Sequence, residues 1–250
     1  MEKILEWVKG YKIPFLQKPL QQAPVYSKIK DADKKDMNQA ISLLLKQGAI
    51  VSARELKDQF LSPYFLIKKP NGKNRFILNL KQLNEFIETR HFKMEDFRTV
   101  TKLIQRNGYM VTLDLKDAYF LISVDPNDRK YLRFKYNNVL YEFTCAPFGL
   151  APIPYVFTKL LKPVIAWLHL CNISCSIYLD DLIIFGESEQ ECEANAKSAY
   201  NILEYLGFII NFEKSSLTSR RRCTHLGFIF DSENLTIELT LEKGIRYFEQ

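Results

Sequence analysis

The fold of this chain is decided by the stretch Ser176-Ile177-Tyr178-Leu179-Asp180-Asp181-Leu182-Ile183-Ile184-Phe185. Two adjacent carboxylates, Asp180 and Asp181, lie between two strongly apolar runs that favour β-structure. Such runs pair as a β-hairpin, which places both acids at its tip. An acidic pair in a turn is usually only a solvated turn, so these residues alone do not establish a function.

A third carboxylate ends another apolar strand earlier in the chain, in Val111-Thr112-Leu113-Asp114-Leu115. Two strand ends could therefore bring Asp114 and Asp180 together. Converging carboxylates repel one another unless a cation lies between them, and hard oxygen ligands select Mg²⁺ or Mn²⁺. A pair of such ions can activate an attacking oxygen and stabilise a leaving one, as in polymerases and some nucleases. The alternative is that Asp114 caps the following turn.

Length and composition are those of a globular protein. The chain has 250 residues, of which 47% are hydrophobic, so it can bury a substantial core. Its formal charge of +6 suits a polyanionic partner, although the excess is modest. It contains no apolar run of transmembrane length and no secretory leader, so we expect an intracellular protein of the cytoplasm or nucleus with no membrane partner. The five cysteines have neither disulfide nor zinc spacing.

The order of predicted elements indicates an α+β fold. An extended arm is expected over residues 1–30, followed by an amphipathic helix and a β-hairpin that turns at Pro70-Asn71-Gly72. The middle of the chain is rich in predicted strands, and two long helices flank the acidic pair. The expected helices cover 31–48, 154–170, 192–206 and a start at 240, and the expected strands and hairpins cover 62–80, 111–115, 121–124 and 131–141.

Several motifs resemble, in the right order, those of reverse transcriptases. Tyr178-Leu179-Asp180-Asp181 resembles their Tyr-x-Asp-Asp motif, and residues 113–120 resemble their first palm motif. Residues 79–84 resemble the segment that follows the fingers residues, and Leu226-Gly227-Phe228 resembles the primer-grip turn. The resemblance covers roughly residues 45–235. It implies the fingers and palm of a right-hand polymerase, with an antiparallel palm sheet backed by helices and without a thumb.

The resemblance also implies a division into subdomains and a subtype. Within the family, the chain is similar to tyrosine-recombinase retrotransposons of the DIRS and Ngaro type in two stretches, Gly10 to Phe15 and Ala146 to Leu150. The implied division is an N-terminal arm (1–30), fingers (31–110), palm (111–135), a return between fingers and palm (136–155), palm with the primer-grip turn (156–239) and the start of a truncated thumb or connecting helix (240–250).

Roles for single residues follow from the same resemblance. Asp114, Asp180 and Asp181 would bind Mg²⁺, or Mn²⁺ in its place, together with the carbonyl of Leu115. Tyr119 would act as a steric gate against a ribose 2′-OH. The remaining nucleotide contacts would come from Lys69 and Arg75 on the triphosphate, backbone N–H groups of Asp117 and Ala118, Phe148 and Gly149 beneath the base, and Lys214 as a proton donor to pyrophosphate.

Retroviral enzymes usually have Gln where this chain has Phe148. Primer and template would contact Tyr178, the turn Leu226-Gly227 and the basic cluster Arg220, Arg221 and Arg222. Each of these residues also has an ordinary structural interpretation. Lysines and arginines commonly form solvated surfaces, and Tyr119 and Phe148 could be core residues.

Three functions compete on these residues. The first is an RNA-directed DNA polymerase of a retrotransposon, which adds deoxynucleotides to a primer 3′-OH on an RNA or DNA template and binds an RNA–DNA hybrid. The second is a catalytically weak or inactive nucleic-acid-binding fragment derived from such an element. The third is a metal-dependent nuclease, which would not need Lys69, Arg75 and Tyr119 together. The sequence gives no prediction of oligomeric state.

Overall fold

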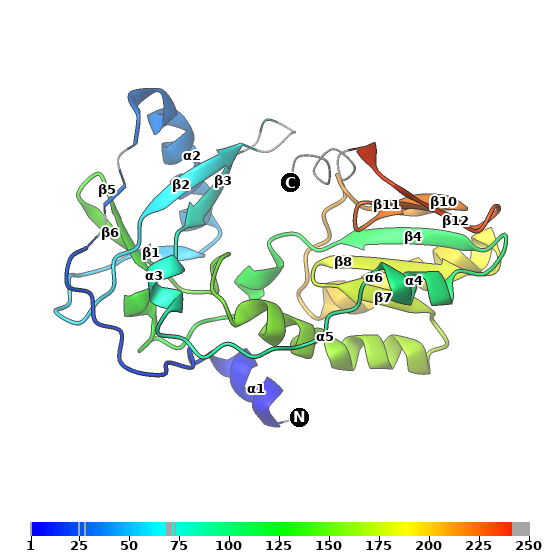
Figure 1. Ribbon diagram of the computed structural model, residues 1–250, viewed down its shortest axis with the longest axis horizontal. Coiled ribbons are helices and arrows are strands. Elements are labelled where there is room, and N and C mark those ends of the chain that lie inside the picture. Colours follow the sequence, from blue (N-terminus) through cyan, green and yellow to red (C-terminus); the bar gives the residue numbers. More distant parts are fainter. Residues whose placement is uncertain (1, 25, 28, 69–71, 73, 242–250) are drawn as a thin grey trace. The chain divides into compact units, whose positions relative to one another are not determined.

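The computed structural model describes residues 2–24, 26, 27, 29–68, 72 and 74–241 of the chain. These residues form two compact units, each built from two separate stretches of sequence (Figure 1). Unit 1 contains residues 1–91 and 119–156, and unit 2 contains residues 92–118 and 157–250. The observed division differs from the expected subdomains, because residues 92–110 group with unit 2 and residues 119–135 with unit 1. The names fingers and palm stay predictions for the units.

Unit 1 holds two small antiparallel sheets. In the first, the strand order is β1-β6-β5, and the second is the β2–β3 hairpin, against which α2 packs. The short helices of the unit are α1, η1, α3, η2 (which begins in unit 2) and η3. The bounds are α1 Glu2–Lys9, η1 Asp31–Asp33, α2 Lys34–Lys46, β1 Ile50–Ser52, β2 Tyr64–Lys68, β3 Asn74–Leu78, α3 Lys81–Asn84, η2 Ala118–Leu121, η3 Arg129–Tyr131, β5 Arg133–Tyr136 and β6 Val139–Phe143.

Aromatic side chains fill the space between the two sheets of unit 1. Phe134 is fully buried, and its ring centroid lies 4.8 Å from that of Phe76 and 5.1 Å from that of Tyr64. Rings of this size each bury a large apolar surface, so they contribute much of the stability of the unit. The β5–β6 hairpin carries this core and turns at Asn137-Asn138, where both residues have positive φ, as a two-residue hairpin turn requires.

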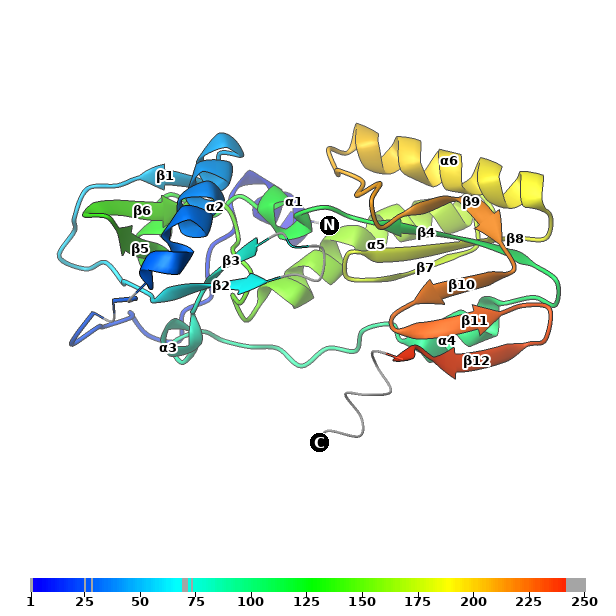
Figure 2. The same ribbon diagram turned by 90° about the horizontal axis from the view of Figure 1, so that it is seen from above.

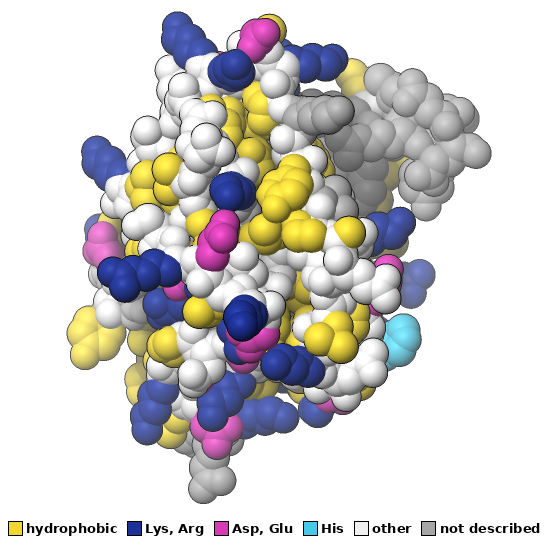
Figure 3. Space-filling model, turned by 90° about the vertical axis from the view of Figure 1, so that its left-hand side faces the viewer, with side chains coloured by type: hydrophobic (Ala, Val, Ile, Leu, Met, Phe, Trp, Pro, Cys, Tyr) yellow, Lys and Arg dark blue, Asp and Glu magenta, His cyan; other side chains and the backbone are white. Residues whose placement is uncertain are grey.

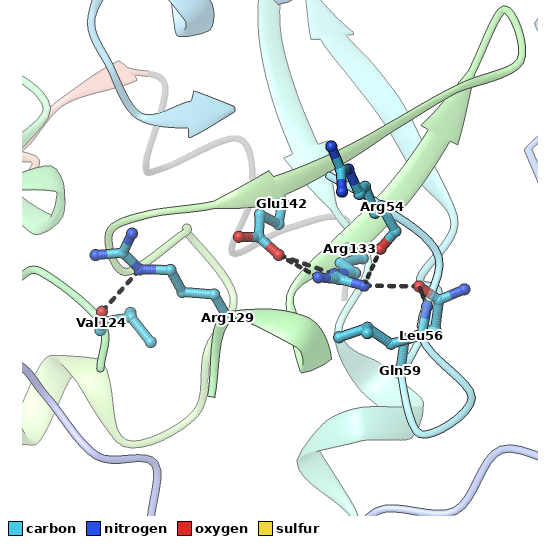
Figure 4. A network of polar contacts seen from close by, with 7 residues as sticks. All are labelled: Arg54, Leu56, Gln59, Val124, Arg129, Arg133 and Glu142. Carbon is cyan, nitrogen blue, oxygen red and sulfur yellow. Dashed lines mark hydrogen bonds and ion pairs between the residues drawn. The ribbon is translucent and has the colours of Figure 1, made fainter. Parts of the chain in front are cut away.

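A buried charge network fastens the segment 53–59 to the β5–β6 hairpin (Figure 4). The Arg133 side chain is only 5% exposed and donates to Glu142 Oε2 from both Nε (2.9 Å) and a terminal nitrogen (2.6 Å). Its other terminal nitrogen donates to the carbonyl of Arg54 (3.0 Å) and to Gln59 Oε1 (2.8 Å). A buried guanidinium is tolerated only when it is paired and hydrogen-bonded in this way.

The N-terminal arm crosses unit 1 (Figure 1). Hydrogen bonds that involve backbone groups hold it there. Tyr11 forms an isolated parallel bridge with Val124, and the backbone N–H of Ile13 donates to Asp128 Oδ2 (2.9 Å). The Gln21 amide both donates to and accepts from the backbone of Leu61, at 2.8 Å each. This side chain thus satisfies backbone groups that lack a strand partner. The expectation that the arm is extended throughout is wrong for its first residues, which form helix α1.

Unit 2 is built on a four-stranded antiparallel sheet in the order β7-β8-β4-β9. Helix α6 packs on β8, β9 and β4 and runs along the sheet in Figure 2. A second sheet, β10-β11-β12, lies beside β4. The bounds are α4 Phe97–Leu103, β4 Tyr109–Asp114, α5 Ile153–Leu170 (which begins in unit 1), β7 Cys175–Tyr178, β8 Asp181–Gly186, α6 Glu189–Tyr205, β9 Ser216–Arg220, β10 Arg222–His225, β11 Phe228–Asp231 and β12 Thr236–Leu239.

The core of unit 2 joins its two sheets. Met110 of β4, Ile183 and Phe185 of β8 and Phe230 of β11 are all buried in one cluster with Val100 of α4. The two sheets of unit 2 therefore share one hydrophobic core. The end of the main sheet that carries the carboxylates is therefore anchored by strands that are buried along most of their length.

Most of the expected elements are present. The helix expected over 31–48 is η1 with α2, and the later helices are α5 and α6. The strand expected over 121–124 is wrong, because that segment makes only single bridges, Ser123 with Cys145 and Val124 with Tyr11. The turn residues 70 and 71 and the helix expected from 240, of which only 240 and 241 are described, lie outside the described residues. No helix in the described part of the chain is long and apolar enough to cross a membrane.

Candidate active site

The acidic pair lies at the tip of the β7–β8 hairpin, as expected. Tyr178 pairs with Asp181, which leaves Leu179 and Asp180 as the two turn residues. Leu179 has a φ of 53°, in the left-handed region that favours glycine or asparagine. A leucine in this conformation is strained, and such strain persists only where the surrounding structure imposes it. Here the two flanking strands fix the turn.

Asp114 reaches the same end of the sheet from the neighbouring strand β4. Its register partner in β8 is Asp181, and the next backbone N–H, that of Leu115, donates to the carbonyl of Asp180 (2.8 Å). The three aspartates therefore come together at one end of unit 2. Asp114 is only 8% exposed.

The proximity of these carboxylates changes the acidity of one of them. The pKa of Asp181 is raised to about 7, mainly by burial and in addition by the negative charges of Asp180 and Asp114. The positive charge of Lys214 acts in the opposite direction. The structure thus concentrates negative charge at the hairpin tip, which is the condition under which a bound cation would be most favourable.

A turn formed by residues 211–215 surrounds Asp114. The Asn211 side chain donates to Asp114 Oδ1 (2.6 Å), Lys214 Nζ lies 3.3 Å from Asp114 Oδ2, and the Ser215 hydroxyl accepts from the Asp114 backbone N–H (2.9 Å). Lys214, a residue picked from the sequence, is thereby placed at the carboxylates. Asn211 and Ser215 were not predicted, because their partner Asp114 lies about a hundred residues away in the sequence.

The donor set suits a hard divalent cation. The three carboxylates supply oxygen ligands, and a cation would offset the repulsion that Asp180 and Asp114 exert on Asp181. Within the described residues no three acidic, histidine or cysteine side chains form a ready-made metal cluster. The two side-chain oxygens of Asp114 contact Asn211 and Lys214. Metal ligation by these residues and by Leu115 stays a prediction.

Glu95 supports the strand that leads into the hairpin tip. Its Oε2 atom accepts hydrogen bonds from the Ser176 hydroxyl (2.5 Å) and from the backbone N–H of Ile177 (3.2 Å). A carboxylate that accepts from a side chain and a backbone group in this way fixes the strand edge. Sequence reasoning missed Glu95, since it stands in an irregular segment with no motif around it.

Unit 1 contains several of the predicted nucleotide-contacting residues. The guanidinium carbon of Arg75 lies 4.8 Å from the centre of the Phe148 ring. Tyr119 also contacts Phe148, with ring centroids 5.1 Å apart. Gly149 has a φ of 96°, which explains the glycine there. Lys69 lies outside the described residues.

Asp117 and Ala118 belong to unit 2 and follow β4. Asp117 has a φ of 48°, and Ala118 begins the 3₁₀ turn η2. Left-handed residues next to right-handed turns can expose neighbouring N–H groups in a concave arrangement that binds anions. The proposed phosphate contact of these two N–H groups stays a prediction.

The predicted primer-grip turn joins β10 to β11. Leu226 and Gly227 both have positive φ, 53° and 74°, as in a two-residue hairpin turn of type I′. The basic cluster near it is less available than the sequence indicated. Arg221 pairs with Glu233 (2.8 Å) and Arg222 with Glu238 (2.9 Å), so these two charges are already compensated by neighbouring glutamates. Arg220 ends β9 and is exposed.

Basic residues in unit 1 are likewise interspersed with acidic ones. Figure 3 shows lysines and arginines spread over the face that carries α2 and the β5–β6 hairpin, with acidic side chains between them. Lys130 and Lys18 both contact Asp58, and Lys135 pairs with Glu55 (3.1 Å). The positive excess of the chain is thus dispersed on this face and does not form one continuous patch.

The geometry can be compared with known proteins. A family model described as reverse transcriptase (RNA-dependent DNA polymerase) matches residues 67–230, more than half of the chain. The chain belongs to this reverse transcriptase family. The matched range contains Arg75, Tyr119 and all three aspartates.

Relatives and solved structures agree with this assignment. The chain is 26% identical over 206 residues to the Tf2-3 and Tf2-4 transposon polyproteins of Schizosaccharomyces pombe, which covers 82% of this chain and 14% of each polyprotein. Its fold is similar to that of a foamy viral protease-reverse transcriptase. The structure in complex with double-stranded DNA has a TM-score of 0.77 at 22% identity (96% of this chain, 52% of that chain), and the structure with RNA/DNA hybrid has a TM-score of 0.76 at 22% identity (92% and 30%).

Proposed function

We propose that this chain is the polymerase part of a retrotransposon reverse transcriptase, which adds deoxynucleotides to a primer 3′-OH on an RNA or DNA template. The observation that carries the proposal is the pairing of Asp114 with Asp181 in adjacent strands, beside Asp180 at the same end of the sheet. Membership of the family supports it. The chain spans 14% of the length of the curated relatives it matches, so the activity of a whole polyprotein is not ascribed to it.

In this proposal unit 2 supplies the catalytic groups. Asp114, Asp180 and Asp181, with the carbonyl of Leu115, hold Mg²⁺, or Mn²⁺ in its place. When bound, the ions lower the pKa of the attacking 3′-OH and stabilise negative charge on the α-phosphate and the leaving oxygen. Lys214 lies 3.3 Å from Asp114 and carries the proton that the pyrophosphate takes up.

Unit 1 supplies most of the groups that bind the nucleotide, and unit 2 adds two backbone N–H groups. Arg75 and Lys69 hold the triphosphate, because a guanidinium presents its donors as a fork that matches phosphate oxygens. The ring of Tyr119 excludes a ribose 2′-OH by its size, and Phe148 with Gly149 lies beneath the base. Asp117 and Ala118 add backbone N–H groups to the phosphates.

The proposed nucleic-acid partners are an RNA template, a DNA primer and their hybrid. Foamy viral structures of similar fold are complexes with double-stranded DNA and with RNA/DNA hybrid, which supports this proposal. Tyr178 and the Leu226-Gly227 turn would contact the primer. Of the three neighbouring arginines, the exposed Arg220 is the strongest candidate for a phosphate contact, because the other two are in ion pairs.

The retrotransposon subtype is a narrower proposal. The stretches Gly10 to Phe15 and Ala146 to Leu150 favour a tyrosine-recombinase element of the DIRS or Ngaro type. Sequencing the genomic element that encodes the chain tests this directly. A tyrosine-recombinase gene in the same element supports the subtype, and an integrase gene in its place contradicts it.

A primer-extension assay distinguishes the three candidate functions. The chain and its Asp180→Asn variant are incubated with an annealed RNA template and DNA primer, Mg²⁺ and deoxynucleotides. Extension by the parent alone supports the polymerase. Binding of the hybrid without extension supports a non-catalytic nucleic-acid-binding protein, and Mg²⁺-dependent shortening of the template supports a nuclease.

A further inference from the structure

Phe148 is the centre of an aromatic cluster in unit 1 that ends in a positive charge. The Arg75 guanidinium lies over its ring at 4.8 Å. Two further rings contact it from η2: Tyr119, tilted, with centroids 5.1 Å apart, and Phe120, edge-on, with centroids 5.9 Å apart. A cation at this distance from a ring is attracted by the negative charge of the π-face.

Hydrogen bonds from the Asn84 side chain fix the backbone that follows Phe148. The Asn84 side chain donates to the carbonyl of Gly149 (2.8 Å) and accepts from the N–H of Ala151 (3.0 Å). A Cβ at Gly149 would lie 3.6 Å from the carbonyl oxygen of Leu78, the last residue of β3. The loop that carries Phe148 is therefore held against the strand that carries Arg75, so ring and guanidinium are kept in register.

We propose that Phe148 is a positioning residue that holds Arg75 in place for the triphosphate of an incoming deoxynucleotide. This inference rests on the proposed function. A cation–π contact uses the charge of the guanidinium and none of its N–H donors, so the contact itself leaves the fork available for phosphate oxygens. A glutamine at position 148 would act differently, because its amide oxygen would accept from one of the guanidinium donors. The aromatic ring thus restrains Arg75 without using the N–H donors that phosphate oxygens would accept from.

The two residues should consequently act as one unit on nucleotide binding. Losing the ring frees the long arginine side chain, and ordering it again on binding costs conformational entropy. Phe148→Leu keeps an apolar side chain but removes the π-face, whereas Phe148→Tyr keeps the face. The effect is expected on the KM for the deoxynucleotide, with little change in kcat, because the carboxylates that perform the chemistry belong to unit 2.

The test is a double-mutant cycle on single-nucleotide incorporation. Phe148→Leu should raise the KM for the deoxynucleotide roughly 3- to 30-fold, the range of a partly desolvated cation–π contact. Phe148→Tyr should restore the parent KM. In an Arg75→Ala background, Phe148→Leu should change KM by less than about twofold, because its partner is gone. Phe65→Leu, an aromatic change on the exposed side of β2, serves as the matched control and should leave KM unchanged.

The inference is overturned if Phe148→Leu leaves KM unchanged, if it raises KM equally in both backgrounds, or if the tyrosine does not restore it. Failure of the proposed function is a separate outcome, seen when the parent chain does not extend a primer at all. In that event the same variants are compared by calorimetry with inorganic tripolyphosphate. Weaker binding by Phe148→Leu that Phe148→Tyr reverses supports the positioning role, and equal binding by all three contradicts it.

Discussion

Removing Glu142 should destabilise unit 1 far more than removing an acid from a surface ion pair. The Arg133 side chain is 5% exposed and the Glu142 side chain 17% exposed. In Glu142→Ala, Arg133 keeps only neutral acceptors, the carbonyl of Arg54 and the amide oxygen of Gln59. A buried charge that loses its partner costs about 3–5 kcal/mol, and we expect about 3 kcal/mol because water can partly reach position 142. That is a large part of the roughly 5–15 kcal/mol that stabilises a typical domain.

Urea unfolding followed by tryptophan fluorescence measures this loss. Trp7 is buried in unit 1 and Trp167 is 57% exposed in unit 2, so a Trp167→Phe background makes the signal report on unit 1. With a denaturant slope of about 2 kcal/mol per molar, the midpoint should fall by about 1.5 M. The matched control is Glu238→Ala, which breaks the exposed Arg222–Glu238 pair and should cost less than about 1 kcal/mol. Equal shifts in the two variants would refute the assignment of a buried, stabilising network.

Three further outcomes are expected. Burial lowers the pKa of His225 to about 4, against about 6.5 when unfolded, so the unfolded state binds more protons between these values. The free energy of unfolding should therefore decrease by up to about 3 kcal/mol as the pH falls from about 6.5 to 4. His225→Phe should remove most of this decrease, and an equal decrease in the variant contradicts the prediction. Tyr119→Ala should admit ribonucleotides in primer extension, and unchanged discrimination between deoxy- and ribonucleotides would refute the steric role. Glu95→Ala should lower stability by about 1–3 kcal/mol, because it leaves the Ser176 hydroxyl and the Ile177 N–H without their acceptor, and a thermal midpoint equal to that of the parent argues against this.

Elements with strong local patterns could be predicted from the sequence. The apolar runs on both sides of Asp180 do form the β7–β8 hairpin, and the turn at Asn137-Asn138 has the positive φ angles that these residues tolerate best. The segment 121–124 shows the limit of such patterns. Two of its residues are buried, but it makes only single bridges, one with Tyr11 of the arm and one with Cys145, and so forms no strand pair.

Polar contacts at the site were harder to predict, because they join residues far apart in the sequence. Asn211 contacts Asp114 and Asn84 contacts Gly149 across separations of 97 and 65 residues. The ion pairs of the arginine cluster could not be predicted for the same reason. Arg221 and Arg222 are neighbours in sequence, but each is paired with a glutamate supplied by a later turn or strand, Glu233 and Glu238.

The central claim is that the three aspartates perform metal-dependent nucleotide addition. It is tested most directly by the rate of single-nucleotide incorporation in Mg²⁺ for Asp114→Asn and Asp180→Asn, beside Asp231→Asn. Asp231 is a suitable control because it is as buried as Asp114 (9% against 8% exposed) and its acceptor role toward the N–H groups of Glu233 and Asn234 survives in asparagine.

Each of the two active-site variants should lose about 1000-fold or more in rate, since several kcal/mol of charge stabilisation depend on the bound ions. The incorporation rate of the Asp231→Asn variant should stay within about threefold of the parent rate. Asparagine has nearly the shape of aspartate, and Asp231 is not one of the three proposed catalytic carboxylates. Incorporation by Asp180→Asn at the parent rate, or equal loss in all three variants, would contradict the account.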